Sequence, residues 1–205
     1  MISSKSILAI IPARLGSKRL KYKNIKLFKG RPLFVWSYIA AKKSKYIDKI
    51  FISTESKRIL NYAKKYGYRS NLLRSKKISK DKTSSEEVIL DVLRKNKKFD
   101  YFILLQPTSP LRTNFDIDRS INLIISKKKN FLVSINRENK KYNGAIYINK
   151  IDKFLKEKKF SNEKKIFFKM SKKKSIDIDR IRDFKQAENY YENNSKTWYQ
   201  KYQFN

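Results

Sequence analysis

Three segments of the chain gather side chains that could bind phosphate and promote its transfer. The first, residues 11–24 (IPARLGSKRLKYKN), directly follows a short apolar run. Arginine and lysine neutralise phosphate charge, whereas backbone N–H groups and a serine hydroxyl bind phosphate oxygens. The segment offers both kinds of group: Arg14, Gly16, Ser17, Lys18, Arg19, Lys21 and Lys23. This turn predicts a polyphosphate site, and the alternative is a flexible basic loop without a ligand.

The second segment, residues 104–112 (LLQPTSPLR), places neutral polar groups after another apolar run. Gln106, Thr108 and Ser109 donate and accept hydrogen bonds, and the two flanking prolines restrict the backbone around them. Such groups suit a ligand that carries hydroxyl or amide groups. The alternative is an ordinary turn between a strand and a helix.

The third segment, residues 175–179 (SIDID), alternates apolar and acidic residues. In an extended chain residues two apart project to the same side, so Asp177 and Asp179 share one face. Paired carboxylates near phosphate-binding cations predict a hard divalent ion, Mg²⁺ or Mn²⁺, which takes oxygen ligands and bridges to phosphates. The alternative is that Asp179 caps the last helix.

Two missing residue types limit the chemistry. The 205 residues include no histidine and no cysteine. Their absence excludes a Ser-His-Asp triad, disulfides, a thiolate nucleophile and the usual zinc sites. Carboxylates, amines, guanidinium groups, hydroxyls and a hard metal ion remain.

The net charge of +33, from 51 basic and 18 acidic residues, has a bland interpretation and two functional ones. Lysine runs such as 127–129 and 172–174 lie beside expected helix ends or in loops, so we expect a solvated surface. The alternatives are an anionic substrate or a nucleic acid. The aromatic residues fall mostly on expected core faces, which argues against nucleic acid. The apolar run 7–11 is too short for an export signal or a membrane span, so we expect a cytoplasmic location and no membrane partner.

The elements that must position these segments alternate along the chain. Apolar runs predict strands at 7–11, 50–52, 101–105, 131–135 and 145–148, and helical spacing predicts helices around 33–40, 59–63, 88–93, 117–125 and 181–191. Pro32 suits a first helical turn, Gly67 a left-handed C-cap, and Ser84 and Ser85 an N-cap. This alternation predicts parallel βαβ units, with helices on both faces of a central sheet. Ligands bind at the carboxyl ends of such strands, so the site should lie after Ile11, Ile52 and Leu105 and around Asp177.

Six stretches in this order resemble one family. They are IPARLGSKRLKYKNIK, KIFISTES, DKTSSEEVILDVL, LLQPTSPLR, NGAIYI and SIDIDRIRDFKQAE, and they cover the chain to about residue 188. The chain resembles the acylneuraminate cytidylyltransferases, which activate sialic acids and related nonulosonic acids as CMP-sugars. The resemblance implies an α/β, three-layer, nucleotide-diphospho-sugar-transferase-like (Rossmann-like) fold with a mostly parallel sheet, as one domain over residues 1–194 with a tail at 195–205.

The resemblance also implies roles for individual residues. The CTP phosphates and cytidine would contact Arg14, Gly16, Ser17, Lys18, Lys23 and Asn24, and the cytosine and ribose would contact Arg74, Thr83, Ser84 and Ser85. The sugar would face Gln106, Thr108, Asn143 and Tyr147, with Phe160 near its acyl group. Asp177 and Asp179 would bind the metal, and Arg14, Lys18 and Asp177 would be catalytic.

The expected reaction is nucleotidyl transfer, in which an anomeric hydroxyl attacks the α-phosphorus of CTP and pyrophosphate leaves. IPARLGSKRL alone also fits 3-deoxy-manno-octulosonate cytidylyltransferases, whereas the later stretches favour the sialic-acid branch. Transfer to that octulosonate is one alternative, and a degenerate homologue that binds nucleotide without turnover is another.

The chain departs from the family pattern within residues 113–142. That segment is about half the family's length and lacks an RRQ-type run, with Arg137 as the sole arginine in VSINRENKKYNGAIYI. In the family this run helps to bind the sugar and carries part of the dimer contact. The residue after Phe160 is Ser161, where the family tends to place an aromatic. A homodimer is compatible with the resemblance, but the short segment argues against it.

Overall fold

A six-stranded sheet forms the centre of the computed structural model, which describes residues 4–96, 98–160 and 165–193. The strands lie in the order β4-β1-β5-β7-β6-β8. Their bounds are β1 Ile7–Pro12, β4 Lys49–Ser53, β5 Tyr101–Leu104, β6 Phe131–Asn136, β7 Tyr142–Lys150 and β8 Ile166–Met170. All five strands expected from the sequence are present. The strand β8 was not expected.

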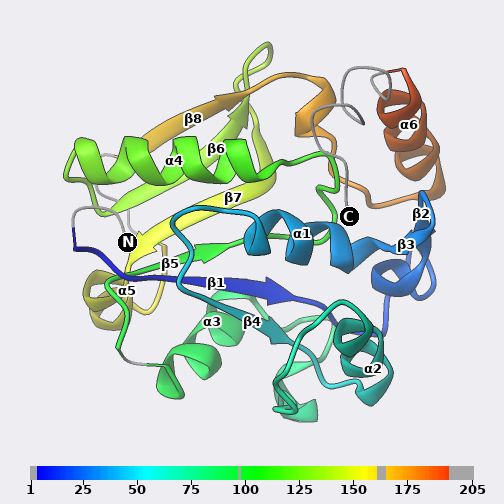
Figure 1. Ribbon diagram of the computed structural model, residues 1–205, viewed down its shortest axis with the longest axis horizontal. Coiled ribbons are helices and arrows are strands. Elements are labelled where there is room, and N and C mark those ends of the chain that lie inside the picture. Colours follow the sequence, from blue (N-terminus) through cyan, green and yellow to red (C-terminus); the bar gives the residue numbers. More distant parts are fainter. Residues whose placement is uncertain (1–3, 97, 161–164, 194–205) are drawn as a thin grey trace.

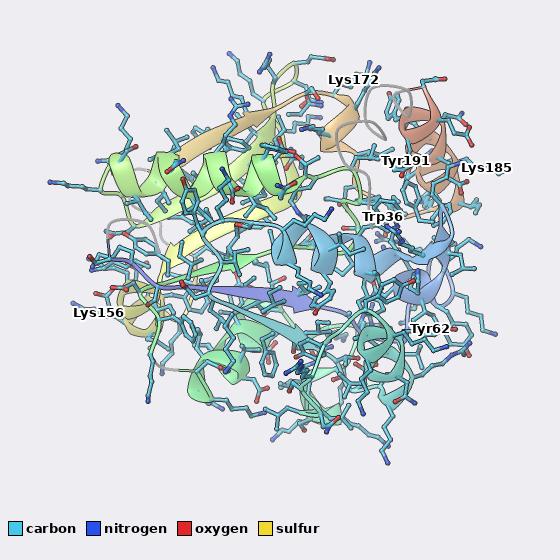
Figure 2. The ribbon with its side chains drawn as sticks, in the orientation of Figure 1. Trp36, Tyr62, Lys156, Lys172, Lys185 and Tyr191 are labelled. Atoms are coloured by element: carbon cyan, nitrogen blue, oxygen red, sulfur yellow. The ribbon has the colours of Figure 1, made fainter. Side chains whose placement is uncertain are left out.

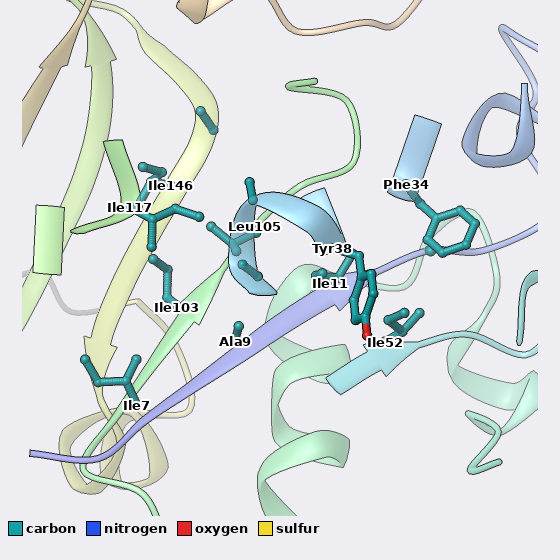
Figure 3. Packing of buried hydrophobic residues seen from close by; sticks show 14 of the residues in the cluster. Ile7, Ala9, Ile11, Phe34, Tyr38, Ile52, Ile103, Leu105, Ile117 and Ile146 are labelled. Carbon is teal, nitrogen blue, oxygen red and sulfur yellow. The ribbon is translucent and has the colours of Figure 1, made fainter. Parts of the chain in front are cut away.

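Helices cover both faces of the sheet and make a three-layer α/β fold, as expected (Figure 1). The helices are α1 Leu33–Lys42, α2 Lys57–Lys65, α3 Ser85–Arg94, α4 Asn114–Ser126, α5 Ile151–Glu157 and α6 Ile181–Glu192. Side chains alternate along β1: Ile7, Ala9 and Ile11 face α1, α2 and α4, and Leu8 and Ile10 face α3 and α5. Figure 3 shows the first of these two cores, in which the side chains of β1 meet those of α1 and β5.

The sheet is mostly parallel. Strands β4, β1 and β5 pair in parallel, as does β6 with β8, whereas β7 is antiparallel to both β5 and β6. The short turn between β6 and β7 forces these neighbours into opposite directions, because parallel neighbours need a long crossover. Their register shifts between Val133 and Ile135, which leaves a bulge at the Asn143–Gly144 end of β7.

Helix caps agree with the sequence. Ser84 is the N-cap of α3 in a capping box with Glu87, and Gly67 has φ +89° just after α2. Pro32 precedes the first residue of α1 rather than lying within its first turn. Asp179 does not cap α6, because the carboxylate of Asp183 accepts the N–H groups of Asp179 and Arg180.

An aromatic cluster attaches α6 to the early part of the chain. Phe28 lies in a two-stranded hairpin, β2 Leu27–Phe28 with β3 Arg31–Pro32, and contacts Trp36, Phe184 and Tyr191 edge-on at 5.6–5.8 Å between ring centroids. Figure 2 shows Trp36 and Tyr191 between α1 and α6. Tyr191 lies beyond residue 188, where the resemblance to the family ends, and residues 194–205 lie outside the described residues.

The lysine runs lie on the surface, as expected. Residues 127–129, 172 and 173 are exposed, and Lys174 reaches a carboxylate of Asp116 at 2.7 Å. Lysines 156, 172 and 185 point away from the core in Figure 2. Within the described ranges, no helix combines the length and the apolar character needed to cross a lipid bilayer.

Candidate active site

Two adjoining cavities lie beyond the carboxyl ends of β1 and β5, where the topology predicts a ligand. The first has a volume of about 290 Å³ and the second about 310 Å³. They share four lining residues: Arg14, Ser17, Lys23 and Asp81. Ten of the residues predicted for the site line the first cavity: Arg14, Ser17, Lys23, Asn24, Arg74, Thr83, Ser84, Ser85, Gln106 and Thr108. Lys18 and Asp179 both line the second, so the early basic turn and one of the two late aspartates meet in one cleft, whereas Asp177 lines neither cavity.

The basic turn after β1 is held from below by buried groups. The Asn24 amide donates to the carbonyl of Arg14 at 2.7 Å, and the N–H of Leu15 donates to Glu55 at 2.7 Å. Glu55 also pairs with Arg74 at 3.3 Å. Gly16 is exposed, and a Cβ there would meet nothing within 4 Å, which leaves room for a ligand against the backbone. Glu55 has no signal in the sequence beyond its place after β4, and the sequence analysis missed it.

Arg74 is almost wholly buried, at 6% exposure, and has two functions in the structure. Its side chain lines the first cavity. Its backbone N–H donates to the carbonyl of Thr54 at 2.7 Å and so anchors the loop after β4. Burial lowers the pKa of Arg74, and the charge of Glu55 opposes that change. The carboxylate thus keeps the guanidinium charged beneath the nucleotide side of the cleft.

Asp81 lies between two of the predicted phosphate-binding cations. Its carboxylate forms an ion pair with Arg14 and lies 3.1 Å from the Lys18 Nζ. Hydrogen bonds from Arg14 and Lys18 lower the pKa of Asp81, so it is ionised at neutral pH. The sequence analysis missed this residue, although it lies inside the DKTSSEEVILDVL stretch.

The acidic pair adopts the alternation that the sequence predicts. Ile176 and Ile178 are buried, whereas the side chains of Asp177 and Asp179 are open to solvent. The N–H of Ile178 donates to the carbonyl of Thr108 at 2.9 Å, which fixes this extended segment against the loop after β5.

The two carboxylates have different surroundings. Asp179 forms ion pairs with Arg19 and, at 3.4 Å, with Lys23; partial burial raises its pKa, but these cations outweigh that effect and lower it. Asp177 is exposed to solvent, and its carboxylate lies close to Gly144 of β7. Desolvation raises the pKa of Asp177 above the ordinary value, against the hydroxyl of Thr108 and the charge of Lys23.

The donor set fits a hard divalent ion. Within residues 4–96, 98–160 and 165–193 there is no cluster of three or more acidic side chains that could hold a metal by itself. Mg²⁺ needs no such cluster, because one or two carboxylates suffice when phosphate oxygens and water complete its coordination. Asp179 offers a carboxylate in the second cavity, and Asp177 offers another beside Gly144, next to Gln106 of the first cavity.

Close packing marks the side of the cleft next to β7. Gly144 has φ +72°, and a Cβ there would lie 2.8 Å from the Gln106 Oε1 and 3.7 Å from the Asp177 Oδ2. Asn143 is buried at 5% exposure; its amide accepts from Ser134 at 2.5 Å and donates to Ser175 at 3.0 Å. The side chain of Asn143 thus holds the bulge of β7, and its role as a sugar contact stays a prediction.

Tyr147 and Phe160 lie side by side on the other face of β7. Their ring centroids are 5.2 Å apart, and Phe160 also stacks on Phe131 at 5.4 Å. Desolvation raises the pKa of the Tyr147 hydroxyl, with a smaller contribution from the charge of Asp177. Phe160 packs against the ring of Tyr147. Ser161, the predicted departure, lies outside the described residues.

Arg112 is a second buried arginine that the sequence analysis did not single out. Its guanidinium donates to the carbonyls of Ala145 at 2.8 Å and Gln106 at 3.3 Å, and to the hydroxyl of Ser37 at 2.5 Å. Burial lowers the pKa of Arg112 to about 9, although the charge of Asp116 opposes that shift. The side chain remains charged at neutral pH and ties the end of β5 to β7 and α1.

Comparison with known proteins identifies the family of the chain. A family model described as cytidylyltransferase matches residues 8–201, which extends past the stretches recognised in the sequence. The CMP-N,N'-diacetyllegionaminic acid synthase of Legionella pneumophila is 32% identical, over 93% of this chain and 98% of its own length. The N-acylneuraminate cytidylyltransferase of Escherichia coli is 33% identical over 88% of this chain, which spans about half (51%) of that protein.

Solved structures agree on the fold. The CMP:2-keto-3-deoxy-manno-octonic acid synthetase solved with CTP superposes with a TM-score of 0.73 at 14% identity, covering 92% of this chain and 99% of that one. At this identity the likeness concerns the fold alone. The family match covers most of the sequence, and the Legionella relative matches almost from end to end. The chain therefore belongs to the cytidylyltransferase family.

Proposed function

We propose that the protein transfers the cytidylyl group of CTP to a sialic-acid-like nonulosonic acid, as a step in cell-surface glycan synthesis. The observation that carries this proposal is the single cleft in which Lys18 and Asp179 line one cavity. The cations of the basic turn, with the carboxylate of Asp179 beside them, suit a metal-bound triphosphate. The names of the relatives supply the second substrate, since they denote N-acylneuraminate, legionaminic acid and pseudaminic acid enzymes.

In this proposal the chain acts mainly by positioning and by stabilising charge. Arg14 and Lys18 bind phosphate oxygens on which negative charge builds. The anomeric hydroxyl attacks the α-phosphorus, the new P–O bond replaces the bond to pyrophosphate, and the hydroxyl proton leaves to water. Asp177 and Asp179 would hold the divalent ion, which supplies Lewis-acid chemistry when bound.

The sugar remains a class rather than a compound. A transfer to 3-deoxy-manno-octulosonate is less well supported. The octonic acid synthetase is only 14% identical to this chain, whereas the relatives that are 32–33% identical are named for other sugars. A reaction that consumes CTP implies a compartment that holds CTP, so we propose the cytoplasm. The homodimer stays a prediction, with the short segment 113–142 as the argument against it.

Pyrophosphate release tests the proposal. CTP is mixed with Mg²⁺ and, in turn, with N-acetylneuraminic, legionaminic, pseudaminic and 3-deoxy-manno-octulosonic acids. We expect release with at least one nonulosonic acid, and none when ATP replaces CTP. Asp152→Asn changes an exposed carboxylate that pairs with Lys150 at 2.9 Å. It is the matched control for Asp177→Asn, because it removes the same charge away from the cleft. Release with the octulosonate alone would transfer the assignment to that branch, and CTP binding without release would identify a binder.

A further inference from the structure

The carboxylate of Asp81 occupies a place that suits a phosphate group. It contacts both Arg14 and Lys18, and it lines both cavities together with Ser17. Arginine and lysine bind carboxylates and phosphates with the same donors. An anion that arrives in the cleft therefore meets two cations that already have a partner.

The loop that carries Asp81 is anchored at both ends, and Asp81 lies in a tight turn between the two anchors. On one side the Nε of Arg74 donates to Ser79 at 3.1 Å, and on the other Ser84 is held in the capping box of α3. Between them the N–H of Thr83 donates to the carbonyl of Lys80 at 3.1 Å, which makes a turn with Asp81 as its second residue. The carboxylate can thus leave the cations through a small movement of the turn, while both anchors stay in place.

The strength of the contact is suited to exchange. The side chains of Arg14 and Asp81 are about one-third exposed, and that of Lys18 is 82% exposed. Ion pairs at such exposure are weak, because water screens the charges. A triphosphate brings several charged oxygens to the same cations and displaces one carboxylate readily.

We propose that Asp81 is an internal substitute for phosphate: it pairs with Arg14 and Lys18 in the free protein, yields them to the triphosphate, and takes them back as pyrophosphate leaves. This role rests on the proposed function and adds to it a residue that sets the affinity for the polyphosphate. Asp81 should therefore weaken the binding of ligands that reach the two cations and leave other ligands unaffected.

Binding measurements with Asp81→Asn test this role. Titration calorimetry in metal-free buffer gives the Kd of CTP, of inorganic pyrophosphate and of cytidine for the variant and the unchanged protein. We expect the Kd of CTP and of pyrophosphate to fall by about three- to tenfold, because no carboxylate competes. The Kd of cytidine should not change, because cytidine carries no phosphate.

Two further variants exclude general charge effects. Asp91→Asn removes one negative charge from α3, where Asp91 pairs with Lys95 at 3.4 Å, and should leave the Kd of CTP within about twofold. In a protein that already carries Arg14→Gln and Lys18→Gln, Asp81→Asn should no longer tighten binding.

The outcomes separate this role from the proposed function. An unchanged or higher Kd of pyrophosphate in Asp81→Asn would contradict the proposal that Asp81 competes with phosphate for Arg14 and Lys18. An equal gain for cytidine would overturn it as well, because the effect would then be a general one. If the unchanged protein binds pyrophosphate but not CTP, the proposed function fails, while the pyrophosphate comparison still decides the role of Asp81.

Discussion

The two halves of the cleft are built in different ways. On the nucleotide side, the predicted phosphate ligands Arg14 and Lys18 are partly or largely exposed and stand on a buried pair, Glu55 with Arg74. On the side next to β7, the predicted sugar residue Asn143 is committed to hydrogen bonds with Ser134 and Ser175, and Gln106, which lines the first cavity, packs closely against Gly144. Exposed cations can change partner, whereas packed groups cannot. Binding of phosphate should therefore be adjustable, and the shape of the sugar side should depend on the stability of the fold.

The largest effect is expected from Asp177→Asn, which tests whether the two halves share one catalytic centre. The amide keeps the shape of the carboxylate but loses the charge that a divalent ion needs. Pyrophosphate release should fall by at least about 100-fold, while the Kd of CTP in metal-free buffer stays the same. A variant that keeps near-native turnover would mean that the metal assignment is wrong.

The two buried arginines give the next comparison. Glu55→Gln leaves Arg74 buried without its carboxylate, which should lower the free energy of unfolding by about 3 kcal/mol and weaken CTP binding. Arg112→Met removes a cation whose partners are neutral oxygens, so the loss should be about 1–2 kcal/mol. Urea unfolding measures both. Equal losses of unfolding free energy in the two variants would show that Arg74 depends on its carboxylate no more than Arg112 depends on neutral oxygens.

Gly144→Ala tests the packed half alone. The new methyl group would lie 2.8 Å from the Gln106 Oε1, and the residue would keep a φ of +72° that side chains rarely adopt. The KM for the sugar should rise about tenfold, with the Kd of CTP unchanged. Ala145→Gly, on the neighbouring residue, serves as the control for altered backbone freedom. A rise confined to CTP would contradict the division into two halves.

The smallest expected effect is a displacement of the pH profile. Because the pKa of Asp177 is raised, its carboxylate takes up a proton at a higher pH than an ordinary aspartate does. As the pH is lowered, turnover should therefore begin to fall at a higher pH than it would with an ordinary aspartate. The same shift means that Asp177 stabilises the fold below its unfolded-state pKa, and that this contribution disappears as pH rises through the folded-state value.

Two measurements check that displacement. The rate of pyrophosphate release is recorded against pH, and urea unfolding of the unchanged protein and of Asp177→Asn is compared at pH 7. The variant should be at least as stable as the unchanged protein there. An acidic limb at the ordinary position of an aspartate would show that the cleft does not desolvate Asp177.

Local patterns predicted much of the fold. The alternation of Ile176, Asp177, Ile178 and Asp179 identified which side chains are buried and which are open to solvent, and Ser84 marked the start of α3. Both signals depend on neighbours in the chain. The reversed direction of β7 and the strand β8 had no such signal, because strand direction and pairing depend on partners far away in sequence.

The same distinction explains the residues that were missed. Asp81 matters because of Arg14, 67 residues earlier, and Arg112 because of Ala145, 33 residues later. Neither the composition nor the spacing of either segment indicates such a pair. Arg112 also lies in a motif whose polar residues drew attention to ligand binding, while its own side chain points into the protein.

The aromatic contacts of α6 connect the cleft with the order in which the chain is made. A nascent chain exposes Phe28, Trp36 and the basic turn early, but Phe184 and Tyr191, which attach α6 to this part of the chain, are made much later. Arg14 and Lys18 can pair with Asp81 before α6 is made, but Arg19 and Lys23 have to wait for Asp179. The docking of α6 is therefore the step that completes the cleft.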